Sequence, residues 1–457
     1  MTLIKSVSGI RGTIGGKPGE NLTPPDIVAF VASYGHFLLK SFDRPRVAVG
    51  RDGRISGSIV KNLAITTLQA LGIDVTDLDY STTPSVEMYV KSSGAQGGII
   101  ITASHNPEEW NALKFLNHHG EFISPEEGEQ IKRLAESGAN EIEFKKVHAL
   151  GQVTSFEKAI ELHIQAILDH PLVNADVIRK SGFTAVVDAI NSTGAISIPP
   201  LLQGLGVKVE VINGEISGRF AHNPEPLPEH LSELCNAVKS HTADIGISVD
   251  PDVDRLALVD EHGVFFGEEY TLVCAADYVL RHQKGPVVSN LSSSMALKDL
   301  ADSYGVTCHY APVGEVHVVN EMKKVFAVIG GEGNGGIIDP QLHYGRDALV
   351  GIAFIFMHMA TSGKSLSQLR QQYTPYVMVK DKITFDPSLS PQGLLDRVAA
   401  HFASHELDLR DGLKVILEGS WVQLRKSNTE PILRIYSEAR SLQEARDLVE
   451  EVKKVIG

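Results

Sequence analysis

The chain has 457 residues, more than one hydrophobic core usually organises, so its length predicts several domains. Its composition is 43% hydrophobic and 21% charged, as in ordinary folded proteins, which argues against extensive disorder. The 56 acidic residues outnumber the 42 basic ones, and a net charge of −14 argues against a nucleic-acid or anionic-membrane partner and favours a small ligand.

The first residues, "MTLIKSVSGIRG", lack the apolar core of a secretory signal. No stretch reaches the ~18 apolar residues that a membrane span needs, and the longest candidate, 348–360, is expected to be a buried helix. The three cysteines are scattered, so they predict neither a disulfide framework nor a cysteine-rich metal site. We therefore expect a cytoplasmic protein without a membrane partner.

One pattern occurs three times: a short strand, a polar loop, an apolar helix, a glycine and a second strand. The segments that carry it are residues 46–78, 184–212 and 286–311. Each predicts a right-handed βαβ unit with parallel strands, although the likeness could also be generic to α/β domains.

A third strand with a polar loop follows each unit, in the sequences "GGIIITASHNP", "ADIGISVDPDVDR" and "FAVIGGEGNGG". Because ligands bind at the carboxyl ends of strands in open α/β sheets, we expect the three loops to face one shared cleft.

The pattern changes beyond residue 372. "VMVKDKITFDP" and "GLKVILEGSWVQLRKS" are typical of strands, and "SLQEARDLVEEVKKVI" has the spacing of an amphipathic helix. The predicted fold class is α/β, with three similar mixed-sheet α/β domains and a smaller C-terminal α+β domain. The predicted domains are residues 1–150, 151–257, 258–371 and 372–457.

The first polar loop places Ser104 just after a strand that is expected to end at Ile101. Pro107 prevents regular pairing beyond it, so the turn should expose the Ser104 hydroxyl. The loop lacks the G-x-S-x-G nucleophile elbow, and His105 beside the serine is weak evidence of catalysis, so a capping serine is the alternative. Lys114 is a candidate proton carrier or a solvated charge.

The second loop carries Asp250, Asp252 and Asp254 at alternate positions, which share a face in extended backbone. Three converging carboxylates need a cation, and oxygen-only ligands select Mg²⁺, Mn²⁺ or Ca²⁺. An EF-hand is disfavoured, because Arg255 stands where that loop needs glycine and the flanks are typical of strands. We expect a strand-borne Mg²⁺ site.

The third loop matches G-x-G-x-x-G, but no helix pattern follows, so a dinucleotide site is not indicated. Its Glu332 and Asn334 suit hydrogen bonds to sugar hydroxyls, with a plain turn as the alternative. The late loop "RKSNTEPILR" groups donors that suit a phosphate, with a solvated turn as the alternative. Its candidates are Arg425, Ser427, Asn428, Thr429 and Arg434. Near the start, Arg11 is a further candidate anion contact.

Together these loops resemble the α-D-phosphohexomutase superfamily, in the family's order and over nearly the whole chain. "TASHNP" resembles its phosphoserine loop, "DPDVDR" its metal loop, "GEGNGG" its sugar-binding loop and "RKSNTEP" its phosphate loop, and "SGIRG" also fits. The resemblance implies three similar α/β domains and a smaller fourth one around a central cleft.

The resemblance also implies roles for the residues of these loops. Ser104 would carry the catalytic phosphoryl group. The implied metal ligands are Ser104, Asp250, Asp252 and Asp254. The residues implied in charge stabilisation and proton transfer are Arg11, His105 and Lys114. Glu332 and Asn334 would bind the sugar, and the candidates of the fourth loop would bind the phosphate that is not transferred.

The implied reaction is the reversible interconversion of hexose 1-phosphate and 6-phosphate, through a phosphoserine enzyme and a 1,6-bisphosphate intermediate. The implied cofactors are Mg²⁺ and a hexose 1,6-bisphosphate activator. "GEGNGG" with "RKSNTEP" most resembles phosphoglucosamine mutases, and a phosphoglucomutase/phosphomannomutase is the alternative. The family commonly has Ser where Asn334 stands and His where Gly336 stands, which leaves the sugar open.

Two function classes compete with a mutase. A Mg²⁺-dependent sugar phosphatase would share the carboxylates but release inorganic phosphate, and a sugar-phosphate sensor would bind without turnover. In each case the partner is a small phosphorylated sugar, and the protein is expected to be a monomer or a homodimer.

Overall fold

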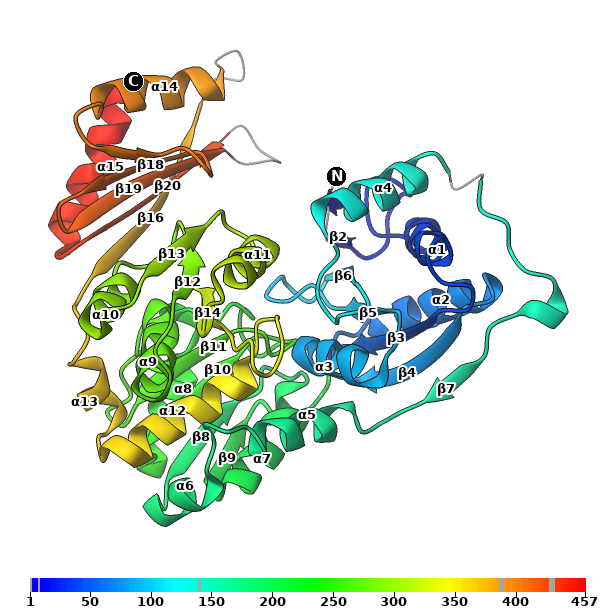
Figure 1. The fold of residues 1–457 in the computed structure, drawn as a ribbon, viewed down its shortest axis with the longest axis horizontal. Coiled ribbons are helices and arrows are strands. Elements are labelled where there is room, and N and C mark those ends of the chain that lie inside the picture. Colours follow the sequence, from blue (N-terminus) through cyan, green and yellow to red (C-terminus); the bar gives the residue numbers. More distant parts are fainter. Residues whose placement is uncertain (1, 7–8, 139–140, 386–389, 427–431) are drawn as a thin grey trace. The chain divides into compact units, whose positions relative to one another are not determined.

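The computed structural model describes residues 2–6, 9–138, 141–385, 390–426 and 432–457 (Figure 1). The chain forms two compact units. Unit 1 comprises Met1–Thr271 and Asn334–Ser367, and unit 2 comprises Leu272–Gly333 and Gln368–Gly457. Two helices run across the division, α9 (Glu268–His282) and α13 (Leu366–Arg370).

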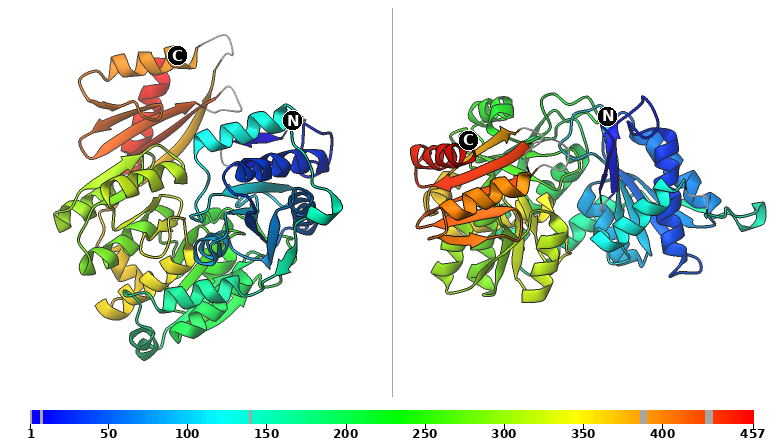
Figure 2. Two further views of the ribbon diagram at one scale, coloured as in Figure 1. Left: turned by 45° about the vertical axis from the view of Figure 1, so that its right-hand side comes forward. Right: turned by 90° about the horizontal axis from the view of Figure 1, so that it is seen from above.

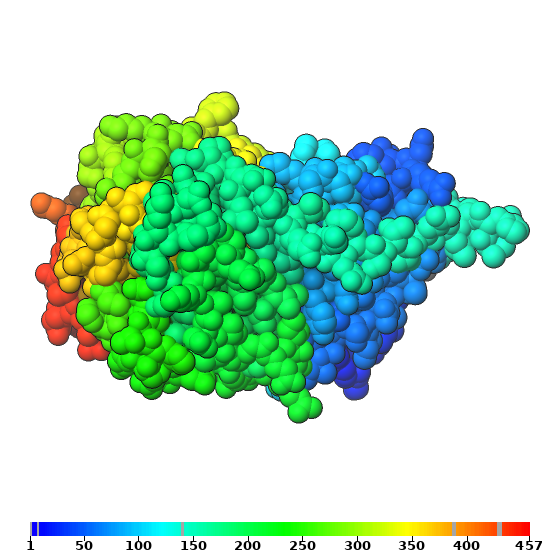
Figure 3. Space-filling view, turned by 90° about the horizontal axis from the view of Figure 1, so that it is seen from below, coloured from blue at the N-terminus to red at the C-terminus, as the bar shows by residue number. Residues whose placement is uncertain are grey.

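The first sheet of unit 1 has the strand order β1-β2-β6-β5-β3-β4-β7. Its strands are β1 (Ile4–Ser6), β2 (Gly9–Thr13), β3 (Arg46–Arg51), β4 (Asp74–Tyr80), β5 (Gly97–Ile101), β6 (Trp110–Leu116) and β7 (Val153–Ser155). The helices beside it are α1 (Pro24–Leu39), α2 (Gly57–Ala70), α3 (Thr83–Ser93), α4 (Pro125–Glu136) and the short η1 (Val147–Ala149). The side chains of η1 are not buried, and its segment projects from the surface in Figure 3.

Both faces of the inner strands of this sheet are buried. Val47 and Val49 belong to the core that α1, α2 and α4 cover, whereas Ala48 between them packs with α3 on the other face. This alternation follows from the two-residue period of a strand, and burial on both faces explains the run of apolar residues in "GGIII".

The second sheet of unit 1 has the order β11-β10-β8-β9. Its strands are β8 (Thr184–Asp188), β9 (Lys208–Ile212), β10 (Ile245–Val249) and β11 (Leu256–Asp260). The remaining elements of unit 1 are α5 (Ala159–Leu168), α6 (Ala175–Ser181), α7 (Gly194–Leu205), η2 (Pro228–His230), α8 (Ser232–His241), β15 (Gly336–Ile338) and α12 (Ala348–Ser362). The helix expected over 348–360 is α12, and most of its side chains are buried.

Unit 2 contains three parallel strands and a separate antiparallel sheet. The parallel strands are β12 (Val287–Asn290), β13 (Cys308–Ala311) and β14 (Ile329–Glu332), with helices α10 (Ala296–Tyr304) and α11 (Glu315–Val325). The antiparallel sheet has the order β16-β20-β19-β18-β17. Its elements are β16 (Val377–Thr384), α14 (Pro391–His401), β17 (Glu406–Asp408), β18 (Leu413–Leu417), β19 (Ser420–Lys426), β20 (Ile432–Ala439) and α15 (Leu442–Ile456). Helix α15, red in Figure 2, lies alongside this sheet.

The predicted threefold pattern is confirmed. Strands β3 and β4, β8 and β9, and β12 and β13 pair in parallel, each pair joined by a helix. The third strand of each group, β5, β10 or β14, pairs in parallel with the first. The predicted fold class is confirmed with it. Among the described residues, no helix has the length and apolarity that crossing a bilayer requires.

The glycine of the repeated pattern ends the connecting helix. Gly206 after α7 and Gly305 after α10 have φ of +80° and +69°, the left-handed conformation that turns the chain towards the next strand.

Replacing Gly305 tests this role. None of the described atoms that lie outside its own helix and chain neighbours comes within 4 Å of a Cβ built there, so a side chain meets only backbone strain. We expect Gly305→Ala to lower the free energy of unfolding by about 1–2 kcal/mol. Gly305→Asn should cost less, because asparagine tolerates this conformation. Urea denaturation followed by the fluorescence of Trp421, which is buried in the same unit, measures both; equal losses would contradict the explanation.

Candidate active site

Ser104 lies three residues beyond β5, in a left-handed conformation with φ of +49°. Its Oγ donates to Asp250 Oδ2 at 2.5 Å and lies 3.3 Å from His105 Nδ1. The prediction that the turn exposes the hydroxyl is wrong, since Ser104 is only 8% exposed. The left-handed turn, held by the bond from Ser104 N to the Thr102 hydroxyl, directs the side chain towards the acidic loop.

Arg54 holds the backbone of this serine loop. Its side chain is fully buried, and its Nε donates to Asp52 Oδ2 at 3.1 Å. Its two terminal nitrogens donate to four carbonyl oxygens at 2.6–2.9 Å, those of Ser104, Asn106, Pro107 and Trp110. Arg54 was not among the residues predicted from the sequence. The available signal was the polar cluster "GRDGR" at the carboxyl end of β3, the strand beside β5.

The three aspartates of the second loop do converge. Asp250, Asp252 and Asp254 are fully buried, and one carboxylate oxygen of each lies within 4.8 Å of those of the other two. The predicted cause, an extended backbone, is wrong. The chain turns between β10 and β11, with φ of +63° at Val253, and Asp250 Oδ1 accepts from the backbone N of Asp254 and of Arg255 at 3.1 Å each.

These carboxylates fit a divalent metal ion. Asp252 Oδ1 and Asp254 Oδ1 are buried and have no hydrogen-bond partner among the described residues. A buried carboxylate oxygen without a partner is costly, and a hard cation satisfies it. The residues present therefore match the expected metal site in ligand chemistry and number.

Cationic and polar groups surround the acidic loop. Lys114 Nζ lies 2.8 Å from Asp252 Oδ2 and 3.6 Å from Asp254 Oδ2. Arg346 Nη2 donates to Asp254 Oδ2 at 2.7 Å, and the Thr83 hydroxyl donates to Asp252 Oδ2 at 2.6 Å. Arg346 and Thr83 were missed, because no local pattern links them to residues so distant in the chain.

Burial and neighbouring charges shift the pKa values of Asp250 and Asp252 in opposite directions. Burial, together with the charges of Asp254 and Asp252, raises the pKa of Asp250. Burial alone would raise the pKa of Asp252 too, but the Lys114 ammonium holds it well below its usual range. Burial opposes the charge on Lys114, yet Asp252 and Asp254 raise its pKa above the ordinary value. Lys114 is thus held as a cation.

His105 is held neutral. Burial, and then the positive charges of Arg255 and Arg346, lower the pKa of His105 to about 2. Beside the Ser104 hydroxyl, His105 is a neutral hydrogen-bonding group in this arrangement. Arg11 lies on β2 opposite Ala112 of β6, on the sheet face that also carries Lys114, two residues further along.

Glu332 and Asn334 have different surroundings. Glu332 ends β14 and is 5% exposed, and its Oε1 accepts from Asn290 Nδ2 at 3.0 Å and from Gly314 N at 3.2 Å. Asn334 is partly buried, and its Oδ1 accepts from Gly336 N at 3.2 Å. The chain continues as strand β15, so no helix begins at this loop, as the sequence predicted.

The fourth loop is only partly described, since Ser427, Asn428 and Thr429 lie outside the described residues. Arg425 of β19 stands directly opposite Arg434 of β20, which stands opposite Lys382 of β16. Directly opposite residues share a sheet face, and the other face packs against α14 and α15 through residues such as Leu424 and Leu433.

The cation row of Arg425, Arg434 and Lys382 needs a negative partner. Like charges directly opposite one another in a sheet are destabilising. Asp411 Oδ2 lies 2.8 Å from Arg425 Nε and compensates one of them. A phosphate between the arginines and the lysine would compensate the rest. Lys382 was missed, although "KDKIT" places it on the exposed alternate positions of a strand.

The site residues therefore fall into two groups. In unit 1 the structure brings together Ser104, His105 and Lys114 with the three aspartates. Glu332, Arg425 and Arg434 belong to unit 2.

Comparison with known proteins matches the chain along almost its whole length. Four phosphoglucomutase/phosphomannomutase models match, for alpha/beta/alpha domains I, II and III and for the C-terminal domain. The matched residues are 3–142, 161–263, 267–376 and 378–455, respectively.

Relatives matched along nearly their whole length indicate the same family. The chain is 35% identical to the "Phosphoglucomutase/phosphomannomutase" of Thermococcus kodakarensis, covering 97% of this chain and 96% of the relative. It is 33% identical to the "Probable phosphoglucosamine mutase" of Methanopyrus kandleri, covering 98% and 96%. A crystal structure of a phosphoglucomutase/phosphomannomutase family protein from Burkholderia thailandensis shares the fold, with a TM-score of 0.84, 22% identity and coverage of 99% and 96%. The chain therefore belongs to the phosphoglucomutase/phosphomannomutase family of the α-D-phosphohexomutase superfamily, and it is a phosphohexomutase, an isomerase.

Proposed function

We propose that this phosphohexomutase interconverts the 1- and 6-phosphates of glucosamine through a phosphorylated Ser104 and a 1,6-bisphosphate intermediate. The observation that carries the proposal is the contact between the Ser104 hydroxyl and the buried aspartate loop, 2.5 Å from Asp250 Oδ2. A serine placed there would hold its phosphoryl group beside the carboxylates that suit a metal ion.

Asp250, Asp252, Asp254 and an oxygen of the Ser104 phosphoryl group would hold Mg²⁺. When bound, Mg²⁺ would neutralise the negative charge that builds up on the transferring phosphoryl group.

The chain's own residues position the reacting groups. In the first transfer, the bond from phosphorus to Ser104 Oγ breaks and a bond to the oxygen of the free sugar hydroxyl forms. The proton of that hydroxyl passes to a base, and the freed Ser104 Oγ takes up a proton. In the return transfer, the bond from phosphorus to the sugar's other ester oxygen breaks and a bond to Ser104 Oγ forms. The serine proton passes to a base, and the freed sugar oxygen is protonated to a hydroxyl. His105 and Lys114 are the proposed proton-transfer groups, and Lys114 and Arg11 the proposed cationic contacts of the phosphoryl oxygens.

The bisphosphate must turn end for end between the two transfers. Glu332 and Asn334 are the proposed contacts of the sugar hydroxyls, and the cation row is the proposed site of the phosphate that is not being transferred. Guanidinium groups suit this role because they bind phosphate through two parallel charged hydrogen bonds. A hexose 1,6-bisphosphate would act as the activator that phosphorylates Ser104.

The choice of glucosamine is supported by the relative from Methanopyrus kandleri, which is named for that sugar. The relative from Thermococcus kodakarensis, named for glucose and mannose, supports the alternative. Phosphorus NMR with the 1-phosphates of glucosamine, glucose and mannose, each with Mg²⁺ and glucose 1,6-bisphosphate, tests the proposal. Fastest conversion of the glucosamine ester supports it, and release of inorganic phosphate alone would indicate a sugar phosphatase instead.

Ser104→Ala should lower mutase turnover by roughly 10³-fold or more, because the phosphoryl carrier is lost. The same NMR assay measures this, and intact-mass spectrometry should show no phosphorylated protein. Ser137→Ala, at an exposed position outside the loop, is the control and should keep the wild-type rate. Near-normal turnover in Ser104→Ala would rule out the phosphoserine mechanism.

Arg54→Lys should lower kcat by about 10- to 100-fold while KM changes little, since displacement of the serine loop by about 1 Å costs rate rather than substrate affinity. Arg44→Lys, at an exposed arginine, is the matched control. Steady-state kinetics with circular dichroism as a folding check measures both. A rise in KM at unchanged kcat would contradict the positioning role.

Lys382→Gln should raise KM for the sugar phosphate several-fold, because one cation of the row is removed. KM of the variant should also depend less on ionic strength than KM of the wild type. Lys380→Gln is the control, since Lys380 lies on the same strand but stands opposite Tyr436 instead of Arg434. Kinetics at two salt concentrations would measure the effect, and equal changes in the two variants would count against a phosphate on the row.

A further inference from the structure

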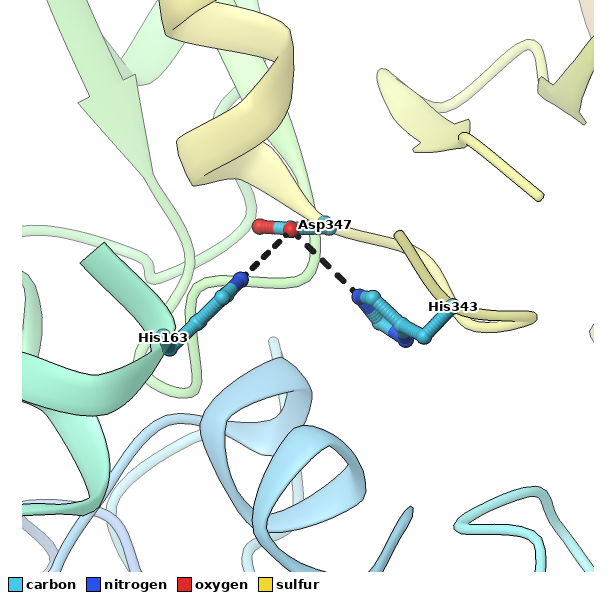
Figure 4. Close-up of side chains that lie close together, drawn as sticks. All are labelled: His163, His343 and Asp347. Atoms are coloured by element: carbon cyan, nitrogen blue, oxygen red, sulfur yellow. Dashed lines mark hydrogen bonds and ion pairs between the residues drawn. The ribbon is translucent and has the colours of Figure 1, made fainter. Parts of the chain in front are cut away.

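We propose a second divalent-metal site, formed by His163, His343 and Asp347 and suited to a transition-metal ion such as Zn²⁺ (Figure 4). It consists of two imidazoles and one carboxylate, all buried in unit 1, and shares no ligand with the aspartate loop. The proposal does not depend on which sugar the enzyme uses.

The three ligand atoms converge. His163 Nε2 lies 2.9 Å from Asp347 Oδ2, and His343 Nε2 lies 3.4 Å from the same oxygen. All three atoms lie within 4.8 Å of one another. In a tetrahedral zinc site with ligand distances of ~2.0–2.1 Å, neighbouring ligand atoms are roughly 3.3 Å apart. The distances to the carboxylate are thus close to those of a metal's ligand shell.

Separate elements hold the three side chains. His163 lies on α5, His343 lies in the loop that follows β15, and Asp347 caps the start of α12. Asp347 Oδ1 accepts from the backbone N of Leu349 and Val350 at 2.8 and 3.3 Å. One carboxylate oxygen is thereby fixed to the helix, and the other is directed at the two rings.

The outer nitrogens of both rings face polar groups of α3. His163 Nδ1 lies 3.1 Å from Ser85 Oγ, and His343 Nδ1 lies 3.2 Å from Glu87 Oε2. Histidines that bind metals usually have such an outer partner, which leaves the lone pair of the other nitrogen directed at the metal. Gly345 lets the chain pass close to this glutamate, because a Cβ there would lie 1.9 Å from Glu87 Oε2.

Charge balance also favours a cation. The side chains of Glu87 and Asp347 are both 0% exposed, so two carboxylates are buried together. Buried charges are strongly disfavoured unless compensated. One divalent ion with two neutral imidazoles compensates both, and the imidazole ligands favour Zn²⁺ over the Mg²⁺ expected at the aspartate loop. Protons on the two rings would supply the same charge, so measurement must distinguish a metal from protons.

Cobalt uptake distinguishes them. The full-length protein would be produced in medium containing Co²⁺ and dialysed against excess Mg²⁺, so that Mg²⁺ occupies the oxygen-only aspartate site. We expect about one equivalent of Co²⁺ by elemental analysis, with the intense visible absorption of tetrahedral Co²⁺. His163→Gln and His343→Gln should each lose at least tenfold in Co²⁺ affinity.

Two controls separate this site from its surroundings. His170→Gln removes another buried histidine paired with a carboxylate, Asp339 at 2.9 Å, and should keep the cobalt spectrum. Asp252→Asn should abolish turnover yet also keep the spectrum, which distinguishes failure of this proposal from failure of the proposed function. Uptake unchanged in the two cluster variants would overturn the proposal. A Mg²⁺-saturated wild type that retains no tetrahedral Co²⁺ would overturn it whether or not the variants fold.

Discussion

The burial of three carboxylates at one point is the constraint on which the site in unit 1 depends. Asp250, Asp252 and Asp254 are all inaccessible to solvent and close enough to repel one another. Repulsion of this kind persists only where the surroundings supply positive charge and donors. Lys114, Arg346 and the hydroxyls of Ser104 and Thr83 do so in part, and the oxygens that they leave unsatisfied are those that a metal ion would use.

The parallel strands determine where these groups can come from. Ser104 follows β5 and the acidic loop follows β10, the third strand of its group in each case, and Arg54 follows β3, the first strand of its group. Carboxyl ends of parallel strands lie at one sheet edge, so residues far apart in sequence become neighbours there. A repeated βαβ plan thus allows a short loop from each sheet to supply one chemical function.

The fold was largely predictable from the sequence, because strand and helix periods and the glycine after each helix are local signals. The Gly206 turn, for example, needs only residues within its own helix and the next strand. The four loops were identifiable for the same reason. Their identity as carriers of serine, aspartate, glutamate and arginine chemistry could be inferred before any distance was known.

What could not be predicted depends on residues that meet only in the folded chain. Ser104 is buried where its hydroxyl meets Asp250, 146 positions away, through a left-handed turn that has no glycine to signal it. The carboxylates converge through a turn at Val253 and not through a strand. The sequence thus predicted their convergence correctly but attributed it wrongly to an extended backbone. The role of Arg54 was difficult to predict because four of its partners are backbone carbonyls, which have no residue-type pattern, so the only signal was its place in "GRDGR" after β3.

The segment that starts α12 connects the two ionic clusters of unit 1. Arg346 donates to Asp254 in the acidic loop. The carboxylate of the next residue, Asp347, pairs with His163 and His343. Asp347 is also the cap of a helix whose residues are almost all buried, so this short segment has little freedom to move. A change of charge at either cluster must therefore be accommodated by side-chain and ion rearrangement more than by backbone movement. Adjacent residues, Arg346 and Asp347, thus anchor one segment to both clusters, one with oxygen ligands only and one with mixed nitrogen and oxygen ligands.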